Sequence, residues 1–224
     1  MRVLLHPLPF DASVWPDEVR LLDESIAPTL YDFGEDIRGW ARGVLDLAGP
    51  GPLDLVGNSV GGSCALEVAA LAPDRVRSLV LIGAKAGHRP DPEFRDEALR
   101  VLGEDGLDAA FDKYWAPLFA PGTDPSVIDR GRAFAHAAGV AAVRRGVAAF
   151  HSRPDRHDFA LGLDVPVLVI AGEHDVGAAR TLGLGGELRH GTYRQLDGCG
   201  HFAPLEQPSQ LANLLKGFAT MAVP

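Results

Sequence analysis

The chain has 224 residues, of which 46% are hydrophobic and 23% charged, and its formal net charge is −9. This composition is ordinary for a globular protein, and the length is enough to bury a core. Because lysine and arginine form no cluster, nucleic acid and anionic membranes are not expected partners. No stretch is long enough to cross a bilayer, and His6 and Pro7 break the first apolar run too early for a signal peptide. We therefore expect one soluble, cytoplasmic folding unit.

The sequence offers no framework for a disulfide, metal or cofactor. Its two cysteines, Cys64 and Cys199, are too few for a disulfide scaffold. The spacings of histidine, cysteine and carboxylate residues match no metal site, and no Gly-x-Gly-x-x-Gly pattern opens the first helix. We therefore expect neither a metal nor a cofactor.

The most informative segment is Gly57-Asn58-Ser59-Val60-Gly61-Gly62, which lies between an apolar run, 52–56, and a small-residue helical stretch, 63–71. Strand, tight turn and helix form the context in which a nucleophilic serine is presented. The flanking glycines let the turn close, and the helix N-terminus points its amides at the same spot. A turn without a catalytic role is the alternative for an isolated match. A catalytic turn requires a histidine base and an acid later in the chain.

Between residues 84 and 163 the strand signal disappears and amphipathic helical segments take over. They are separated at Gly103, at Pro121-Gly122 and at Gly139. The predicted helices cover residues 93–102, 106–115, 125–138 and 140–151.

Two later loops carry the side chains that a nucleophilic serine needs, in the order serine, acid, histidine. Asp175 follows the apolar run 165–171, which is predicted to be a buried parallel strand. Ligand-facing groups collect at that end of such strands. His201 lies in a glycine-rich loop after the alternating strand 192–196. Asp175 and His201 are therefore the candidate acid and base.

These motifs resemble the α/β-hydrolase superfamily, in the branch that has a helical cap. The resemblance rests on residues 57–62, 153–175 and 198–208, which together span most of the chain. Three motifs in the family's order are far more specific than any one of them. Carried over residue by residue, they imply a catalytic triad of Ser59, Asp175 and His201.

The resemblance also implies the fold, a mostly parallel sheet of about six strands. A core of residues 1–84 and 164–224 is expected to carry a helical cap, 85–163, inserted between the sixth and seventh strands of the family. The family's N-terminal hairpin has no counterpart, because the first strand opens within two residues of Met1. The expected strands are residues 2–5, 28–33, 53–56, 76–82, 165–171 and 192–196.

In the family's strand order, the loss of the hairpin places residues 29–33 at the edge of the sheet. An unpaired edge is a template for another strand. We therefore predict either a homodimer that pairs or covers this edge, or shielding of the edge by the segment around Trp40.

An oxyanion hole requires two backbone N–H groups aimed at the charge that develops on the carbonyl oxygen. Val60, directly after the candidate nucleophile, supplies one. In similar hydrolases the other comes from the loop after an early strand, which here implies Leu8. Pro7 stands where the family usually has glycine, but Leu8 keeps its own N–H. His6 is expected to brace this loop by hydrogen bonding.

Aromatic and aliphatic side chains of the cap are candidates for the substrate pocket, although the alternative is that most of them pack the cap onto itself. The candidates are Phe111, Tyr114, Trp115, Leu118, Phe119, Phe134 and Phe150, with Phe202 of the histidine loop. The histidines outside the motifs are expected to be solvated or satisfied locally: His136, His151, His157 and His190.

The predicted reaction is hydrolysis of a small or medium apolar ester through an acyl-enzyme. The Gly-Asn-Ser-x-Gly-Gly turn also resembles that of ring-cleavage-product hydrolases, so hydrolysis of a lactone or a carbon–carbon bond stays open. A third alternative is a non-catalytic member of the fold that binds a small molecule. Halide displacement is excluded, because Ser59 stands where that reaction requires a carboxylate.

Overall fold

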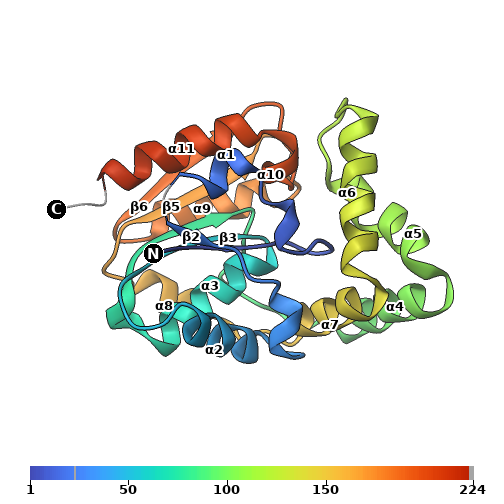
Figure 1. Ribbon diagram of the computed structural model, residues 1–224, viewed down its shortest axis with the longest axis horizontal. Helices are drawn as coiled ribbons and strands as arrows, with labels where there is room; N and C mark the ends of the chain where they lie inside the picture. The colour runs from blue at the N-terminus through green and yellow to red at the C-terminus, as the bar shows by residue number, and fades with distance from the viewer. Residues whose placement is uncertain (23, 222–224) are drawn as a thin grey trace.

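A sheet of six parallel strands forms the centre of the computed structural model, which describes residues 1–22 and 24–221 (Figure 1). The predicted parallel α/β sheet is thereby confirmed. Since all strands run in one direction, the loops that follow their carboxyl ends meet at one edge of the sheet. In spatial order the strands are β2 (Ser25–Ile26), β1 (Arg2–Leu5), β3 (Leu53–Asn58), β4 (Val76–Ile82), β5 (Val167–Gly172) and β6 (Gly191–Leu196).

The strand register brings the candidate residues together. Ile82 at the end of β4 pairs with Asn58 at the end of β3 and with Ile170 of β5. Ser59 and Gly83, which follow Asn58 and Ile82 along the chain, therefore leave the sheet side by side.

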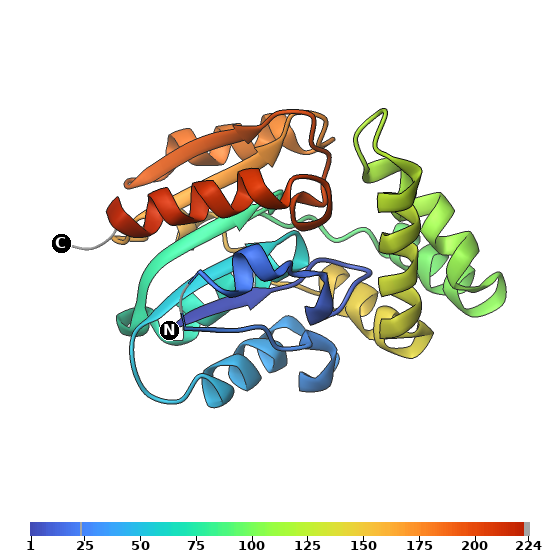
Figure 2. The same cartoon turned by 45° about the horizontal axis from the view of Figure 1, so that its top comes forward.

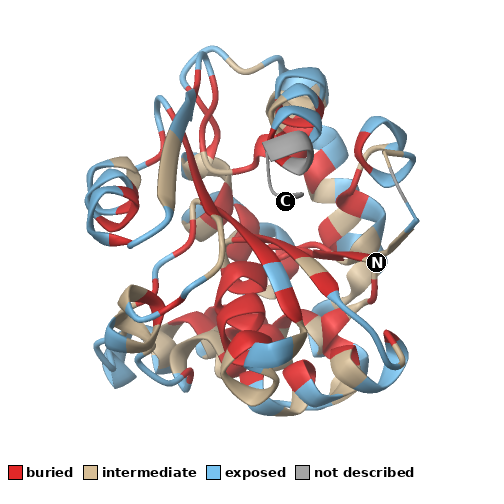
Figure 3. Cartoon of the chain, turned by 90° about the vertical axis from the view of Figure 1, so that its left-hand side faces the viewer, coloured by how far each residue is buried: buried red, intermediate tan, exposed pale blue. Residues whose placement is uncertain are grey.

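Helices cover both faces of the sheet. Figure 1 shows α1 (Asp17–Arg20) and α11 (Pro208–Met221) on one side, and α2 (Ile37–Leu47) and α3 (Val60–Leu71) on the other. Buried residues are concentrated in the central strands β1, β3, β4 and β5 and in one helix, α3 (Figure 3), whereas β2 and most of β6 are less buried. In α3 every residue from Val60 to Ala69 is buried, because its glycines, alanines and serine let it pack closely between the sheet and α2.

Five helices lie between β4 and β5 in the chain. The first four form a separate group beyond the carboxyl ends of the strands (Figure 2), and α4 packs on α7. A π-helical turn, Phe111–Trp115, continues α5. The helices are α4 (Pro92–Glu104), α5 (Gly106–Ala110), α6 (Pro125–Ala138), α7 (Val140–His151) and α8 (His157–Leu161).

The strand predicted at residues 28–33 is wrong. The structure has a 3₁₀ turn at Leu30–Phe33, and the edge strand is the shorter β2. The turn is held from the inside, because Tyr31 donates its hydroxyl to Phe10 O at 2.8 Å and packs edge-on against Trp40. The homodimer predicted through this edge stays untested, but the long open strand on which it rested is absent.

The remaining helical elements are α9 (Ala178–Glu187), α10 (Ala203–Glu206) and the 3₁₀ turns Ala12–Val14, Pro73–Arg75 and Ala116–Leu118. Within residues 1–22 and 24–221, no helix combines the length and apolar character that a membrane span requires.

Candidate active site

Ser59 sits at the turn between β3 and α3 with φ +55° and ψ −118°. Among the described residues it is the only non-glycine residue with a positive φ, a conformation that side chains other than glycine rarely adopt. Its N–H donates to Ile82 O at 2.8 Å, which ties the turn to β4. A strained serine held this way is typical of a nucleophile turn.

The glycines around Ser59 are required because neighbouring atoms approach their Cα positions too closely to leave room for a side chain. A Cβ on Gly57 would strike the backbone of Gly61, one on Gly61 would strike Leu5 O, and one on Gly62 would strike the Cβ of Ala84. Because two of these neighbours are backbone atoms, no rotamer change could relieve the overlap. The geometry therefore agrees with the tightly closed turn that these glycines predict.

Asp175 and His201 form a hydrogen-bonded pair next to this turn. His201 Nδ1 lies 2.8 Å from Asp175 Oδ2, and the Gly177 N–H donates to Asp175 Oδ1 at 2.8 Å. Burial by itself would raise the pKa of the Asp175 carboxyl. The hydrogen bond and charge of His201, the Gly177 N–H and the charge of Lys85 outweigh burial and hold that pKa below its usual value.

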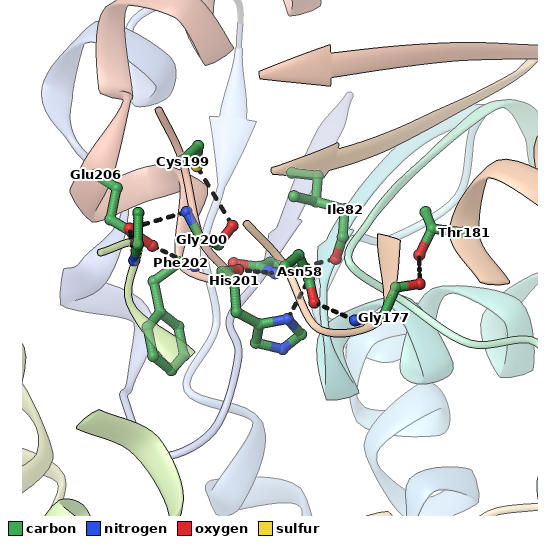
Figure 4. Close-up of polar contacts among 11 residues, drawn as sticks. Asn58, Ile82, Gly177, Thr181, Cys199, Gly200, His201, Phe202 and Glu206 are labelled. Atoms are coloured by element: carbon green, nitrogen blue, oxygen red, sulfur yellow. Dashed lines mark hydrogen bonds and ion pairs between the residues drawn. The ribbon is translucent and has the colours of Figure 1, made fainter. Parts of the chain in front are cut away.

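Asn58 fixes the loop that carries His201. Its side-chain amide is fully buried and donates to Ile82 O at 3.0 Å and to His201 O at 3.2 Å (Figure 4). The residue before Ser59 therefore links the ends of β3 and β4 to the histidine.

Glu206 fixes the same loop from the other side. Its carboxylate accepts the N–H groups of Gly200 and Phe202, both at 2.9 Å (Figure 4). It also accepts the Ala120 N–H at 2.8 Å, and His201 N–H donates to Leu118 O at 2.9 Å. The segment that follows the π-helical turn is thus fastened directly to the histidine loop.

A cavity of about 240 Å³ opens over these groups, and Ser59, Asp175, His201 and Leu8 all line it. Its volume corresponds to about eight water molecules, which suits a small ligand. The outer wall is mostly apolar and comes from the helices between β4 and β5: Phe94, Tyr114, Trp115, Leu118, Val147 and Phe150.

Four predicted pocket residues are not on this wall. Phe111 is fully buried, and Phe119 and Phe202 pack against each other with ring centroids 4.8 Å apart. Phe134 is half-buried against the core. These rings pack the helices onto themselves and onto the histidine loop, which is the alternative that the sequence left open.

His151 corrects the expectation that histidines outside the motifs are solvated or satisfied locally. Its ring lines the cavity and packs against Phe94 and Phe150 at centroid distances of 5.5 and 5.2 Å. Burial, followed by the charge of Arg153, lowers the pKa of His151 to about 4. His151 therefore presents a neutral ring to the cavity at neutral pH.

Val60 and Leu8 are the two candidate donors of an oxyanion hole. Val60 is the first residue of α3 and directly follows Ser59. Leu8 lies on the cavity wall, in a turn that Phe10 closes by donating its N–H to Pro7 O at 3.1 Å. Within the described chain, neither the Val60 nor the Leu8 N–H donates to a backbone carbonyl. Both are available to a ligand.

His6 braces the turn that carries Leu8. The Leu30 N–H donates to His6 Nε2 at 2.9 Å, and His6 Nδ1 lies 3.2 Å from Pro7 O. An acceptor role for Nε2 requires the neutral ring. Burial lowers the pKa of His6 to about 4, against a smaller opposing effect of the Pro7 carbonyl and Asp11.

Because His6 is buried in its neutral form, we expect the fold to lose stability in acid. The unfolded chain binds a proton at His6 near pH 6.5, whereas the folded chain binds it only near pH 4, so stability falls as the pH drops through this window. The expected loss is about 3 kcal/mol in the free energy of unfolding. The measurement is urea unfolding at pH 7 and at pH 4. Between these two pH values, the free energy of unfolding of His6→Gln should fall by about 3 kcal/mol less than that of the wild type. His174→Gln, which removes a more exposed ring, should retain the wild-type fall; equal falls in both variants would contradict the assignment.

The chain matches the model of the alpha/beta hydrolase family over residues 3–214 and belongs to that family. A 2-hydroxymuconate semialdehyde hydrolase from Pseudomonas putida is 44% identical over 71 residues, and one from Pseudomonas sp. strain CF600 is 41% identical over 83 residues. These matches cover 26% and 32% of this chain and only 25% and 29% of the relatives. The matched segments thus span between a quarter and a third of the curated relatives.

Similar solved structures cover almost the whole chain. A thermophilic esterase from Thermogutta terrifontis, with malate bound, superposes with a TM-score of 0.88 at 25% identity, covering 99% of this chain and 89% of the esterase. The enol-lactonase from Burkholderia xenovorans LB400 gives 0.83 at 22% identity, with coverage of 98% and 90%. The 2-hydroxy-6-oxo-6-phenylhexa-2,4-dienoate hydrolase from Rhodococcus sp. strain RHA1 gives 0.73 at 22%, with coverage of 98% and 90%. These structures share the fold of this chain, which belongs to the alpha/beta hydrolase family.

Proposed function

We propose that this protein is a serine hydrolase that cleaves small or medium apolar esters through an acyl-enzyme. The observation that carries the proposal is that Ser59 and the hydrogen-bonded Asp175–His201 pair line one cavity of about 240 Å³. The mostly apolar wall suits an acyl chain, and the volume suits a short one.

In the proposed reaction, His201 Nε2 takes the proton of Ser59 as its hydroxyl attacks the carbonyl carbon. Asp175 keeps the proton of the neutral imidazole on Nδ1 and stabilises the imidazolium that forms. The Val60 and Leu8 amides hold the oxyanion of the tetrahedral intermediate. His201 then protonates the leaving alcohol, and later activates the water that releases the acid and restores Ser59.

A second candidate is hydrolysis of a carbon–carbon bond. It is favoured by the segments shared with two 2-hydroxymuconate semialdehyde hydrolases. Lactone hydrolysis stays open beside it and would use the same residues, since an enol-lactonase has a similar fold.

The experiment that tests the proposal combines labelling with a substrate panel. A fluorophosphonate should modify the purified protein once per chain, at Ser59, and p-nitrophenyl acetate, butyrate and octanoate should be hydrolysed with a preference for the shorter chains. A vinylogous 1,5-diketone acid and a series of lactones test the alternatives. A protein that neither reacts with the fluorophosphonate nor hydrolyses any of these substrates would be a non-catalytic binding protein, and the proposal would be wrong.

Gly83 is a residue that this mechanism requires and that the sequence motifs did not single out. A Cβ on Gly83 would lie 2.7 Å from Asp175 Oδ2 and 3.0 Å from His201 Nδ1, so a side chain there pushes the pair out of place. Gly83→Ala should lower kcat for p-nitrophenyl butyrate about 10²-fold. Gly49→Ala is the matched control, because Gly49 has φ +60° against +55° at Gly83 but open space around it. If both variants lost the same activity, backbone strain and not the clash would be responsible.

A further inference from the structure

A second cavity, of about 650 Å³, lies beside the first. Lys85, in the loop after β4, lines both cavities. Its Cε is 4.0 Å from the position that a Cβ on Gly177 would take, and the Gly177 N–H is bonded to Asp175. Lys85 therefore stands at the junction of the two cavities, next to the candidate catalytic acid.

The second cavity is lined by more cations than its acids neutralise. Lys85, Arg89, Arg153 and Arg180 all line it. Among the described ion pairs none involves these four side chains. Only two carboxylates of the described residues, Asp155 and Glu187, line the same cavity.

The acids nearby are engaged elsewhere. Asp155 accepts the N–H groups of His88 at 3.0 Å and His157 at 2.9 Å. Glu187 lies 3.5 Å from the His157 ring, and Asp175 is bonded within the candidate active site. None of these carboxylates is within ion-pair distance of the four cations.

Arg153 is the strongest sign of a built site, because it is only 7% exposed and has no carboxylate partner. One guanidinium nitrogen donates to Phe150 O and Cζ lies over the Phe150 ring, 3.9 Å from its centroid, while Nε is buried without a hydrogen-bond partner. Burial lowers the pKa of Arg153 to about 10. Burial and the charges of Arg180 and Arg153 lower the pKa of Lys85. A buried charge without a partner is unfavourable, and an anion in this cavity would stabilise it.

We propose that the second cavity binds a carboxylate of the substrate, so that the preferred substrate is an ester or lactone of a dicarboxylic acid. This inference rests on the proposed hydrolase function. The apolar cavity holds the part of the acyl chain next to Ser59. The free carboxylate at the far end of that chain binds Lys85, in the cavity that Arg153 and Arg180 also line. The apolar wall of the first cavity and the cationic side chains of the second thus bind opposite ends of one acyl group.

The test compares two esters that differ only in this carboxylate, mono(4-nitrophenyl) glutarate and its methyl ester. The wild type should have the higher kcat/KM for the acid. Lys85→Met should lower the ratio of the two kcat/KM values about ten- to hundredfold, as expected for a lost hydrogen bond to a charged group. The methyl ester reports any general damage to the site. Lys216→Met, which removes an exposed lysine from α11, should leave the ratio at the wild-type value. An equal ratio in the wild type and Lys85→Met would overturn the proposal.

A binding measurement separates this inference from the hydrolase proposal. Free glutarate should raise the midpoint of thermal unfolding of the wild type and of Lys216→Met, but not of Lys85→Met. If Ser59 is labelled and the methyl ester is cleaved while glutarate has no effect, the protein is a hydrolase without the carboxylate site. If glutarate binds through Lys85 but neither ester is cleaved and Ser59 stays unlabelled, the hydrolase proposal fails and the anion site remains. Lys85 is chosen over Arg153 because its side chain is exposed to the cavity, so its loss does not open the core.

Discussion

Ser59→Ala should lower kcat for p-nitrophenyl butyrate by about 10⁶-fold, the loss expected when the nucleophile of such a mechanism is removed. The expectation follows from the position of Ser59, whose backbone is fixed by Ile82 and by the glycines around it, and whose side chain faces the cavity. No other hydroxyl among the described residues lies on that wall except Tyr114, so no second nucleophile of the same type is available.

The substitution should not disturb the fold. Alanine and serine have the same Cβ, so the strain of the positive φ is common to both, and the variant should unfold at the wild-type temperature within a few degrees. Ser63→Ala is the matched control, because Ser63 is a buried serine of α3, four residues after Ser59, and does not line the cavity; the kcat of this variant should be that of the wild type. Hydrolysis by Ser59→Ala at the wild-type rate, with fluorophosphonate labelling elsewhere, would assign the activity to another residue.

The candidate catalytic residues could be predicted from the sequence because each of them follows a strand that the sequence pattern identifies. The run 165–171 before Asp175 is apolar, the run 52–56 before Ser59 is apolar except for Asp54, and the glycines beside Ser59 and His201 mark turns. In a parallel sheet such loops share one edge, so a local pattern was enough to bring distant residues together. The hydrogen bond between Asp175 and His201 is the result.

Residues 28–33 show where local patterns fail. The segment contains Thr29, Tyr31 and Phe33, residue types that favour strands, but its conformation is set by groups that are distant in sequence. The Leu30 N–H is taken by His6 and the Tyr31 hydroxyl reaches Phe10. Because of these contacts, the segment forms a 3₁₀ turn that braces the Leu8 loop and does not pair with β1 as a strand. Nothing within residues 28–33 indicates these contacts.

The sequence predicted which segment of the chain lines the pocket, but not which of its residues do so. The helical pattern identified the aromatic residues between β4 and β5, yet periodicity does not say which side of a helix faces the cavity and which faces another helix. Trp115 lines the cavity, whereas Phe111, one helical turn earlier, is buried inside. The π-helical turn at Phe111–Trp115 shifts this phase further, since an extra residue in one turn rotates everything that follows.

Gly83, Glu206 and Lys85 were missed for a different reason. Each acts on groups far away in the chain: Gly83 leaves room for Asp175 and His201, Glu206 accepts amides from two separate loops, and Lys85 joins two cavities. One sequence carries no sign of such roles. The signals that do exist are weak, a glycine directly after β4 and a glutamate shortly after the histidine.

Asp175→Asn should lower kcat by about 10⁴-fold while leaving the cavity intact. The amide occupies the volume of the carboxylate, so the Gly177 N–H can still donate to its oxygen. However, an asparagine that turns its NH₂ toward His201 Nδ1 favours the tautomer with the proton on Nε2. That tautomer cannot accept the proton of Ser59. An asparagine also provides no negative charge to stabilise the imidazolium.

The measurement must separate this effect from a loss of structure. Because the pKa of Asp175 is held below its usual value in the fold, the carboxylate contributes stability that is present above the unfolded pKa and is lost as the pH falls through the folded one. Asp175→Asn should therefore also be less stable than the wild type at pH 7, with the difference shrinking in acid. Glu173→Gln is the matched control, since it neutralises an exposed carboxylate of the same loop whose partner, the Gly198 N–H, an amide oxygen can also accept. If Glu173→Gln lost as much activity as Asp175→Asn, the loop as a whole, and not the charge beside His201, would control the reaction.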